Sequence, residues 1–295
     1  MTYLIDIKNF LSSKKFLFDY KKFGDFSENL ELCPESLRNN SKKIQSFYWL
    51  KDSNEKSLPE LKLGHIILSN KIDLSNLHKD FCGSVFVVEN PRYVFNKIIG
   101  EFFVNDTSFV SNNFGNNIGI GTIIEDGVVI GSGTTIGYNN VIKSNTIIGN
   151  NVKIGSNNTI GGVGFGYQMN EEGIYEVIYH IGGVKIEDNV EIGNNNCIDK
   201  AVMGYTHLKK NCKIDNLVHI AHGVEIGENS LIIANSMIAG STVVGDSCWV
   251  APSSSILNNT YFGSNSMCGM GSVIIKNVEN NSLVVGVPAK KIKNL

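Results

Sequence analysis

The sequence is poor in proline, tryptophan and charge. Its 295 residues include five prolines and two tryptophans, and charged residues make up 18%, where about 25% is usual in globular proteins. A net charge of −2 and a pI near 6.3 give no electrostatic reason to expect nucleic acid or an anionic membrane surface as partner. No run approaches the ~18 apolar residues of a membrane span, and the first residues lack the charged-then-apolar order of a signal peptide.

Cysteine is present without metal-binding or redox spacing. The six cysteines are Cys33, Cys82, Cys197, Cys212, Cys248 and Cys268. No two of them form a C-x-x-C pair, which argues against a zinc knuckle or a redox pair. Scattered free thiols without an export signal predict a cytoplasmic protein, and we assign no metal ligands.

Glycine is unevenly distributed along the chain. Only four of the 30 glycines precede residue 115, and this shift predicts a boundary near residues 105–114. We therefore expect a small α/β domain at 1–104, a linker at 105–114 and a second domain at 115–295. In the first domain the patterns predict helices at 10–23 and 93–99 and buried strands at 65–68 and 84–88.

The second domain is organised by a period of six residues. An apolar residue, nearly always aliphatic, recurs every sixth position from Ile118 to Ile160 and again from Ile186 to Ile198. After a four-residue step it resumes at Val202 and continues to Ile274, with Phe262 and Cys268 as the two positions that are not aliphatic. Neither the 3.6-residue period of a helix nor the two-residue period of a strand produces this spacing. A parallel β-helix does, with three six-residue units in each triangular coil.

This repeat predicts a mainly β fold, a left-handed parallel β-helix of about eight coils. The aliphatic side chains would fill the interior, and glycines together with many of the 37 asparagines would occupy turns with positive φ. Residues 161–185 abandon the period and are expected to loop out, and loops on rigid scaffolds often carry function.

Two histidines lie close together outside the predicted interior. In the segment 214–223, Ile220 points inward, so His219 before it and His222 two residues after it face outward or lie in a turn. One coil is eighteen residues, which stacks Gly240 on His222. An imidazole beside an accessible backbone N–H is the arrangement that acyl transfer needs, since one takes a proton and the other holds an oxyanion.

The segments 198–200, 214–222 and 239–242 resemble the UDP-3-O-acylglucosamine N-acyltransferases of lipid A synthesis. The loop 164–166, the four-residue step after Ile198 and the segment 87–95 fit the same family in order and spacing. The resemblance covers roughly residues 40–288. It implies a homotrimer with active sites between neighbouring β-helices and a nucleotide-binding first domain.

The resemblance also implies individual roles. His222 matches the family's catalytic base, Gly240 its oxyanion glycine, and Asp215 a group that orients the imidazole. Phe47 falls at the aromatic that stacks on uracil, with Trp49 as the alternative. We expect Asn216 and His219 to line the sugar site. Near the acyl donor we expect Ala239, Pro288 and Lys290.

Two features depart from the family. Asn259 stands where a second histidine is often found, and the chain ends soon after a Val-Pro-Ala-Lys segment at 287–290 instead of continuing into helices. Such an ending is similar to hexapeptide enzymes that use coenzyme A, whose phosphates lysine can meet as a point charge. No permanently bound cofactor is expected, and the thioester co-substrate is either acyl-CoA or an acyl-carrier protein.

The sequence thus predicts an N-acyltransferase acting on a nucleotide-linked amino sugar, with no nucleic acid or integral membrane partner. The alternative is an acetyl-CoA-dependent N-acetyltransferase that acts on a UDP- or TDP-linked deoxy-amino sugar for surface polysaccharide. The sugar, the nucleotide and the acyl length stay open. A metal-dependent hydratase using His219 and His222, and a non-catalytic scaffold, are less favoured because no third ligand is evident and a scaffold needs no stacked His–Gly pair.

Overall fold

The computed structural model describes residues 2–27, 29–35, 43–50, 60–104 and 117–295. It divides into two compact units, one comprising Met1–Asn105 with Gly166–Tyr179 and the other Asp106–Phe165 with His180–Leu295. The middle of the loop at 161–185 therefore packs with the first unit, whereas the sequence analysis placed the whole loop in the second domain. The linker at 105–114 lies outside the described residues.

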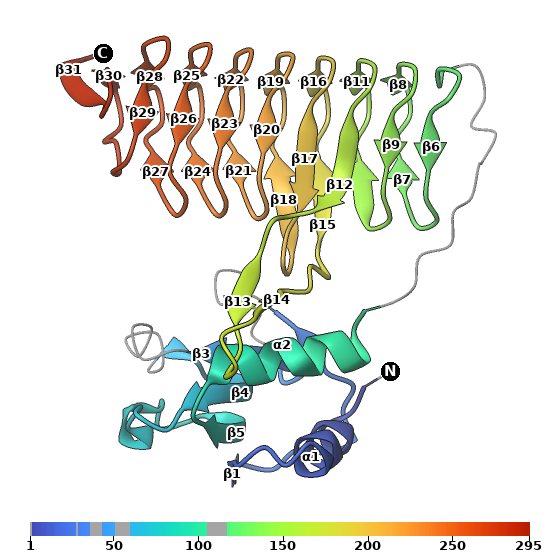
Figure 1. Cartoon of the computed structure of the whole chain (residues 1–295), viewed down its shortest axis with the longest axis vertical. Helices are drawn as coiled ribbons and strands as arrows, with labels where there is room; N and C mark the ends of the chain where they lie inside the picture. The colour runs from blue at the N-terminus through green and yellow to red at the C-terminus, as the bar shows by residue number, and fades with distance from the viewer. Residues whose placement is uncertain (1, 28, 36–42, 51–59, 105–116) are drawn as a thin grey trace. The chain divides into compact units, whose positions relative to one another are not determined.

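The first unit is a small α/β domain built on a five-stranded sheet, ordered β1-β5-β4-β3-β2 (Figure 1). Its elements are α1 (Leu4–Ser13), β1 (Asp19–Phe23), β2 (Cys33–Pro34), β3 (Ser46–Leu50), β4 (Leu63–Ser69), the 3₁₀ turn η3 (Leu74–Asn76), β5 (Cys82–Val88) and α2 (Pro91–Phe102). The hairpin β13 (Tyr167–Met169) and β14 (Tyr175–Val177) belongs to the same unit. Asn90 caps α2, because its side chain accepts a hydrogen bond from the Tyr93 N–H at 3.1 Å, and Pro91 suits the first helical position.

The predicted helix at 10–23 is wrong. Helix α1 ends at Ser13, and Lys15 has a φ of 58°, outside the helical region. Beyond it Phe16, Phe18 and Tyr20 alternate with polar or exposed residues, which is the two-residue period of a strand, and β1 pairs antiparallel with β5.

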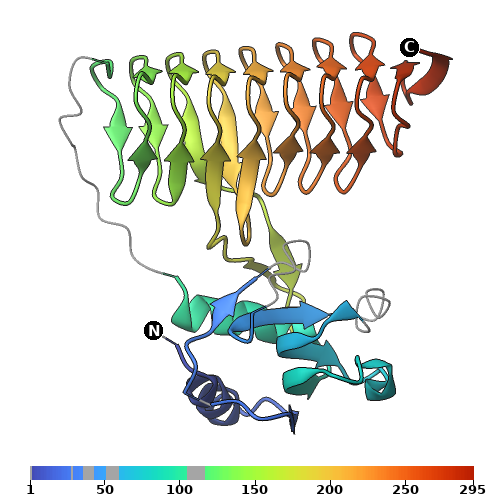
Figure 2. The ribbon, with the colours of Figure 1, turned by 180° about the vertical axis from the view of Figure 1, so that it is seen from behind.

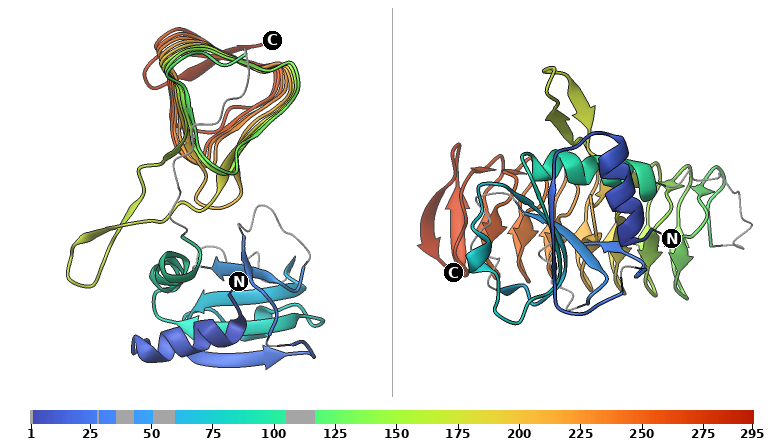
Figure 3. Two further views of the ribbon diagram at one scale, coloured as in Figure 1. Left: turned by 90° about the vertical axis from the view of Figure 1, so that its right-hand side faces the viewer. Right: turned by 90° about the horizontal axis from the view of Figure 1, so that it is seen from below.

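The second unit is a parallel β-helix with three faces, triangular when viewed along its axis (Figure 3). Face 1 contains β8 (Thr135–Ile136), β11 (Lys153–Ile154), β16 (Glu191–Ile192), β19 (Lys213–Ile214), β22 (Leu231–Ile232), β25 (Trp249–Val250), β28 (Met267–Cys268), β30 (Ser282–Val285) and the antiparallel β31 (Lys290–Asn294). Face 2 contains β6 (Ile123–Ile124), β9 (Val141–Ile142), β12 (Thr159–Val163), β17 (Cys197–Lys200), β20 (His219–Ile220), β23 (Met237–Ile238), β26 (Ser255–Ile256) and β29 (Val273–Ile274). Face 3 contains β7 (Val129–Ile130), β10 (Thr146–Ile148), β15 (Gly183–Ile186), β18 (Tyr205–Leu208), β21 (Glu225–Ile226), β24 (Val243–Val244) and β27 (Tyr261–Phe262).

The coils stack side by side along the β-helix (Figure 2), and the hexad aliphatics form one continuous core inside this stack. In face 2, Ile198, Ile220 and Ile238 pair in register and are fully buried. Each such side chain stabilises the fold by about 1.5–3 kcal/mol relative to exposure. The eight strands of face 2 match the eight predicted coils, and the left-handed parallel β-helix predicted from the repeat is confirmed.

Asparagines take the tight turns between faces, as expected. Those at turn positions from Asn139 to Asn265 have φ between 53° and 61°, a left-handed conformation that asparagine tolerates better than most residues. Within the described residues, no helix is long and apolar enough to cross a membrane.

One interior position was predicted wrongly. Val202 is partly exposed, and the chain runs from Ile198 in β17 through 201–204 directly into β18, where Leu208 is the buried residue. The four extra residues therefore lie in the turn between faces 2 and 3. We call this column of turns corner 2–3, and the loop at 161–185 leaves the β-helix at the same corner, between β12 and β15.

Candidate functional site

His222 lies in corner 2–3, in the turn between β20 and β21. Its coil is stacked on that of Gly240, and the Ser241 N–H donates to the His222 carbonyl at 2.9 Å. A Cβ placed on Gly240 would lie 2.7 Å from both Cε1 and Nε2 of His222. The predicted stacking of these two residues is therefore present, and the imidazole rests directly against the Gly240 backbone.

In the described part of the chain, the Gly240 N–H lacks the side-chain acceptor that equivalent N–H groups have at the other two corners, as does the Asn258 N–H one coil further along the same corner. Two residues after an inward aliphatic, the N–H of Ser132, Asn194 or Glu228 donates to a side chain one coil further on, at 2.7–2.9 Å. Among the residues that the structure describes, no such acceptor is bonded to the Gly240 N–H, since the corresponding side chain, Asn258, makes no such bond. Within the described residues this donor has no acceptor, and the backbone that carries it lies against the Nε2 edge of His222, as an oxyanion site requires.

The inserted loop also reaches His222. The rings of His180 and His222 meet edge to face, with centroids 5.2 Å apart and planes at 77°. A Cβ on Gly164 would lie 2.9 Å from Nε2 of His180 and 3.0 Å from Cβ of His222. The segment 164–166 was singled out by the resemblance but His180 was not, since its only sequence signal is its position at the end of the loop.

His219 occupies the outward face of β20, next to the same corner. Its Nε2 lies 3.6 Å from Oδ2 of Asp199, and 44% of its side chain is exposed. Burial raises the pKa of the Asp199 carboxyl, and the nearby His219 acts in the opposite direction. His219 is thus on the surface as predicted, with a carboxylate partner that the sequence did not suggest.

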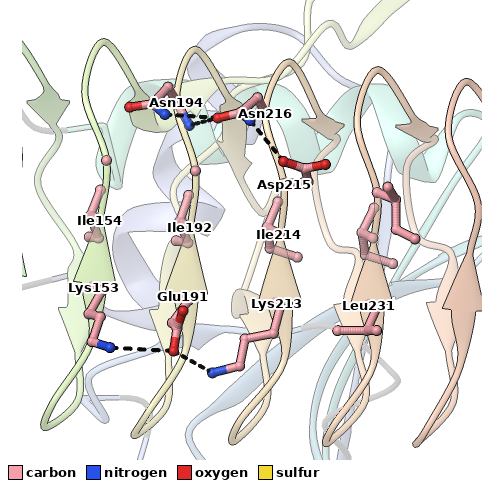
Figure 4. Close-up of a pocket in the computed structure, with 14 residues that line it drawn as sticks. Lys153, Ile154, Glu191, Ile192, Asn194, Lys213, Ile214, Asp215, Asn216 and Leu231 are labelled. Atoms are coloured by element: carbon pink, nitrogen blue, oxygen red, sulfur yellow. Dashed lines mark hydrogen bonds and ion pairs between the residues drawn. The ribbon is translucent and has the colours of Figure 1, made fainter.

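Asp215 and Asn216 lie at a different corner, between faces 1 and 2 (Figure 4). The Asp215 carboxylate accepts hydrogen bonds from Asn216 Nδ2 at 2.8 Å and from the Ala234 N–H at 3.2 Å. The Asn216 side-chain oxygen accepts one from the Asn194 N–H at 2.7 Å. These bonds hold Asp215 in the turn before face 2, so the structure does not bring Asp215 to the imidazole of His222 within one chain.

Phe47 is not available to stack on a nucleotide base. It is fully buried in β3 and stacks on Phe95 of α2, with ring centroids 5.1 Å apart and planes at 28°. Both faces of this strand are covered, because Ser46, Tyr48 and Leu50 are buried as well. Trp49, the alternative, is the partly exposed aromatic of the strand.

The residues predicted near the acyl donor do not form one cluster within the chain. Ala239 is half-buried beside Gly240, whereas Pro288 and Lys290 are exposed in the turn and first residue of the β30–β31 hairpin. The Ala289 N–H donates to Val273 of β29 at 2.8 Å, which places this turn about three strand spacings, roughly 14 Å, from β23. A donor that contacts both Ala239 and the turn with Pro288 and Lys290 must therefore be extended along face 2.

Comparisons with known proteins agree with this architecture. Residues 205–240 match the family "Bacterial transferase hexapeptide (six repeats)". Curated relatives named UDP-3-O-acylglucosamine N-acyltransferase include those of Campylobacter lari, 36% identical over 44% of this chain and 40% of the relative, and Wolinella succinogenes, 39% identical over 45% and 42%. A third, from Rickettsia massiliae, is 48% identical over 29% and 25%.

Solved structures share the fold. LpxA from Acinetobacter baumannii aligns with a TM-score of 0.52 at 25% identity, over 60% of this chain and 67% of that one. The UDP-N-acetylglucosamine acyltransferase from Campylobacter jejuni aligns with a TM-score of 0.55 at 23% identity, over the same shares. The matched segments span less than half the length of the curated relatives. The chain is thus similar to the UDP-3-O-acylglucosamine N-acyltransferase family of hexapeptide-repeat proteins, which bears out the predicted resemblance.

Proposed function

We propose that the protein is an N-acyltransferase that moves an acyl group from a thioester to the amine of a nucleotide-linked amino sugar. The observation that carries this proposal is the contact between the Nε2 edge of His222 and the backbone of Gly240, whose N–H is bonded to no acceptor among the described residues. The curated relatives supply the substrate class, since they are named for acylation of a UDP-linked glucosamine.

In the proposed reaction the amine nitrogen attacks the thioester carbonyl carbon. A carbon–nitrogen bond forms, and the carbonyl oxygen becomes an oxyanion that accepts a hydrogen bond from the Gly240 N–H. The carbon–sulfur bond then breaks. His222 takes the proton from nitrogen and returns it to the departing thiolate, a task suited to imidazole near neutral pH. No oxidant, reductant or metal enters this balance.

The assignment of Asp215 as an orienting group requires a second copy of the chain. Its carboxylate lies at the corner between faces 1 and 2, away from His222 of the same chain. A homotrimer with sites between neighbouring β-helices, as the resemblance implies, would supply it from an adjacent subunit. Light scattering of the purified protein tests this assembly, and a mass of one chain would contradict it.

The donor is proposed to be a coenzyme A thioester, with Lys290 meeting its phosphates. In the hairpin formed by β30 and β31, the Lys291 ammonium donates to Glu279 at 2.7 Å, while the exposed side chain of Lys290 has no hydrogen-bond partner among the described residues. The alternative donor is an acyl-carrier protein, which we expect if the acceptor is the lipid A precursor.

One experiment separates these readings. UDP- and TDP-linked amino sugars are each incubated with acetyl-CoA, a longer acyl-CoA or an acyl-carrier protein, and the products are analysed by mass spectrometry. We expect an amide product from a coenzyme A thioester. Product with acyl-carrier protein alone would reverse the donor assignment, and no amide product with any pair would overturn the proposed function.

Replacement of Trp49 by alanine is expected to weaken nucleotide binding. Stacking of a base on an aromatic ring contributes about 1–3 kcal/mol, which corresponds to roughly 5- to 150-fold in affinity. Calorimetric titration with UDP measures this loss on the full chain. Phe47→Ala is the contrasting variant, since removing a buried aromatic costs about 3–5 kcal/mol of folding stability. Unchanged UDP affinity in Trp49→Ala would remove Trp49 from the site.

A further inference from the structure

His180 lies at the end of the inserted loop, against the proposed base. Its side chain is 5% exposed, and its ring meets that of His222 edge to face at 5.2 Å. Imidazole pairs in this geometry attract because the positive edge of one ring faces the negative face of the other. Nothing in the repeat itself requires a histidine here, since residues 161–185 lie outside the hexad register.

The His222 ring is enclosed by two backbones and by this second ring. Gly240 approaches its Cε1 and Nε2 atoms, and Gly164 approaches its Cβ and Cδ2 atoms, with distances of 2.7–3.1 Å from a Cβ built on either glycine. Any larger residue at 164 or 240 would collide with the imidazole. Two glycines therefore fit the ring closely, and His180 fills the space on the Gly164 side, where its Nε2 lies 2.9 Å from the same built Cβ.

The backbone that carries His180 is held in place by the four-residue step. The Ile181 N–H donates to the Val202 carbonyl at 3.0 Å, the Gly182 N–H to Ala201 at 3.2 Å, and the Gly183 N–H to Gly204 at 2.8 Å. Both departures from the hexad thus meet directly behind His180. These bonds hold the backbone next to His180 against the β-helix.

We propose that His180 is a positioning residue, which holds the imidazole of His222 against the Gly240 backbone. This inference rests on the proposed function, in which His222 takes a proton from the amine. A displacement of a reacting group by about 1 Å can cost about 100-fold in rate, so a ring that fixes the base contributes to kcat without touching substrate.

A double-mutant cycle tests whether His180 acts through His222. We expect His180→Ala to lower kcat by about 10- to 100-fold with little change in KM, and His180→Gln, which keeps a planar polar side chain, to recover part of the loss. In the His222→Ala background, His180→Ala should have almost no further effect, because the ring that it positions is gone. An equal loss in both backgrounds would show a general structural role and overturn the proposal.

Histidine-labelled protein gives a readout that does not depend on activity. The chain has six histidines, and His222→Ala identifies the signals of His222 in a carbon–proton correlation spectrum. His180→Ala should shift these signals, because it removes a neighbouring ring and frees the imidazole. The matched control is His207→Ala, since His207 bonds Glu187 on face 3 at 2.8 Å and should leave the His222 signals in place.

The outcomes separate this inference from the proposed function. Unchanged His222 signals in His180→Ala overturn the positioning role whatever the protein's activity. Wild-type acyl transfer by His222→Ala would instead defeat the proposed base, and with it the catalytic effect of His180. Shifted signals together with a kcat loss that vanishes in the His222→Ala background support both.

Discussion

Replacing His222 by alanine should lower kcat by about 10²–10⁴-fold, the range for a positioned general base. The KM values for sugar nucleotide and donor should change little, because the proton is transferred only as the amine attacks. The loss should not come from unfolding, since His222 lies in a turn at the surface of the β-helix and is only partly buried.

The measurement is steady-state amide formation, with thermal unfolding recorded on the same samples. His207→Ala serves as the control, because it removes a histidine of the same β-helix that lies on face 3, where its Nε2 is 2.8 Å from Oε1 of Glu187. A His222→Ala protein with near-wild-type kcat would falsify the assignment of the base.

Gly240→Ala should lower kcat by about 10²–10³-fold, comparable to the loss of one oxyanion donor. The backbone at Gly240 has no positive φ, so alanine is compatible with its conformation. The new methyl group would instead lie 2.7 Å from Cε1 and Nε2 of His222, closer than real contacts allow. The imidazole must therefore move away from the N–H beside it.

The control for this substitution is the double variant with His222→Ala. Without the imidazole the added methyl meets no ring, so Gly240→Ala should cost much less in that background. If the loss is the same in both backgrounds, Gly240 acts independently of His222, for example because the methyl group blocks access of the oxyanion to the N–H of residue 240. Wild-type kcat in Gly240→Ala would remove Gly240 from the mechanism.

The fold could be predicted wherever the hexad determines it. A period of six is produced by a three-faced coil and not by helices or simple strands, so the buried isoleucines of the core followed directly from spacing. The prediction of Val202 as an interior residue failed because an apolar residue at an irregular step resembles a register shift. The pairing of Leu208 with Ile186 and with Ile226 shows that the extra residues lie in the turn.

The site, like the fold, could be predicted only where its residues are counted from the hexad. Eighteen-residue stacking placed Gly240 on His222, because both positions are counted from inward isoleucines. The roles of Phe47 and Asp215 depended on which side of an element faces outward. Residues on a strand buried on both faces, such as β3, give no alternation from which to decide, and His180 comes from a loop with no period at all.

Corner 2–3 also bears on how such a protein changes over generations. The loop and the four-residue step interrupt successive coils at this corner, yet Ile198 still pairs with Ile220 and Leu208 with Ile226 in register. Insertions and deletions here leave the apolar column intact, so selection on the core does not oppose them. Lineages can therefore lengthen, shorten or exchange the segments around the His222–Gly240 pair while the stack of coils that carries the pair stays the same.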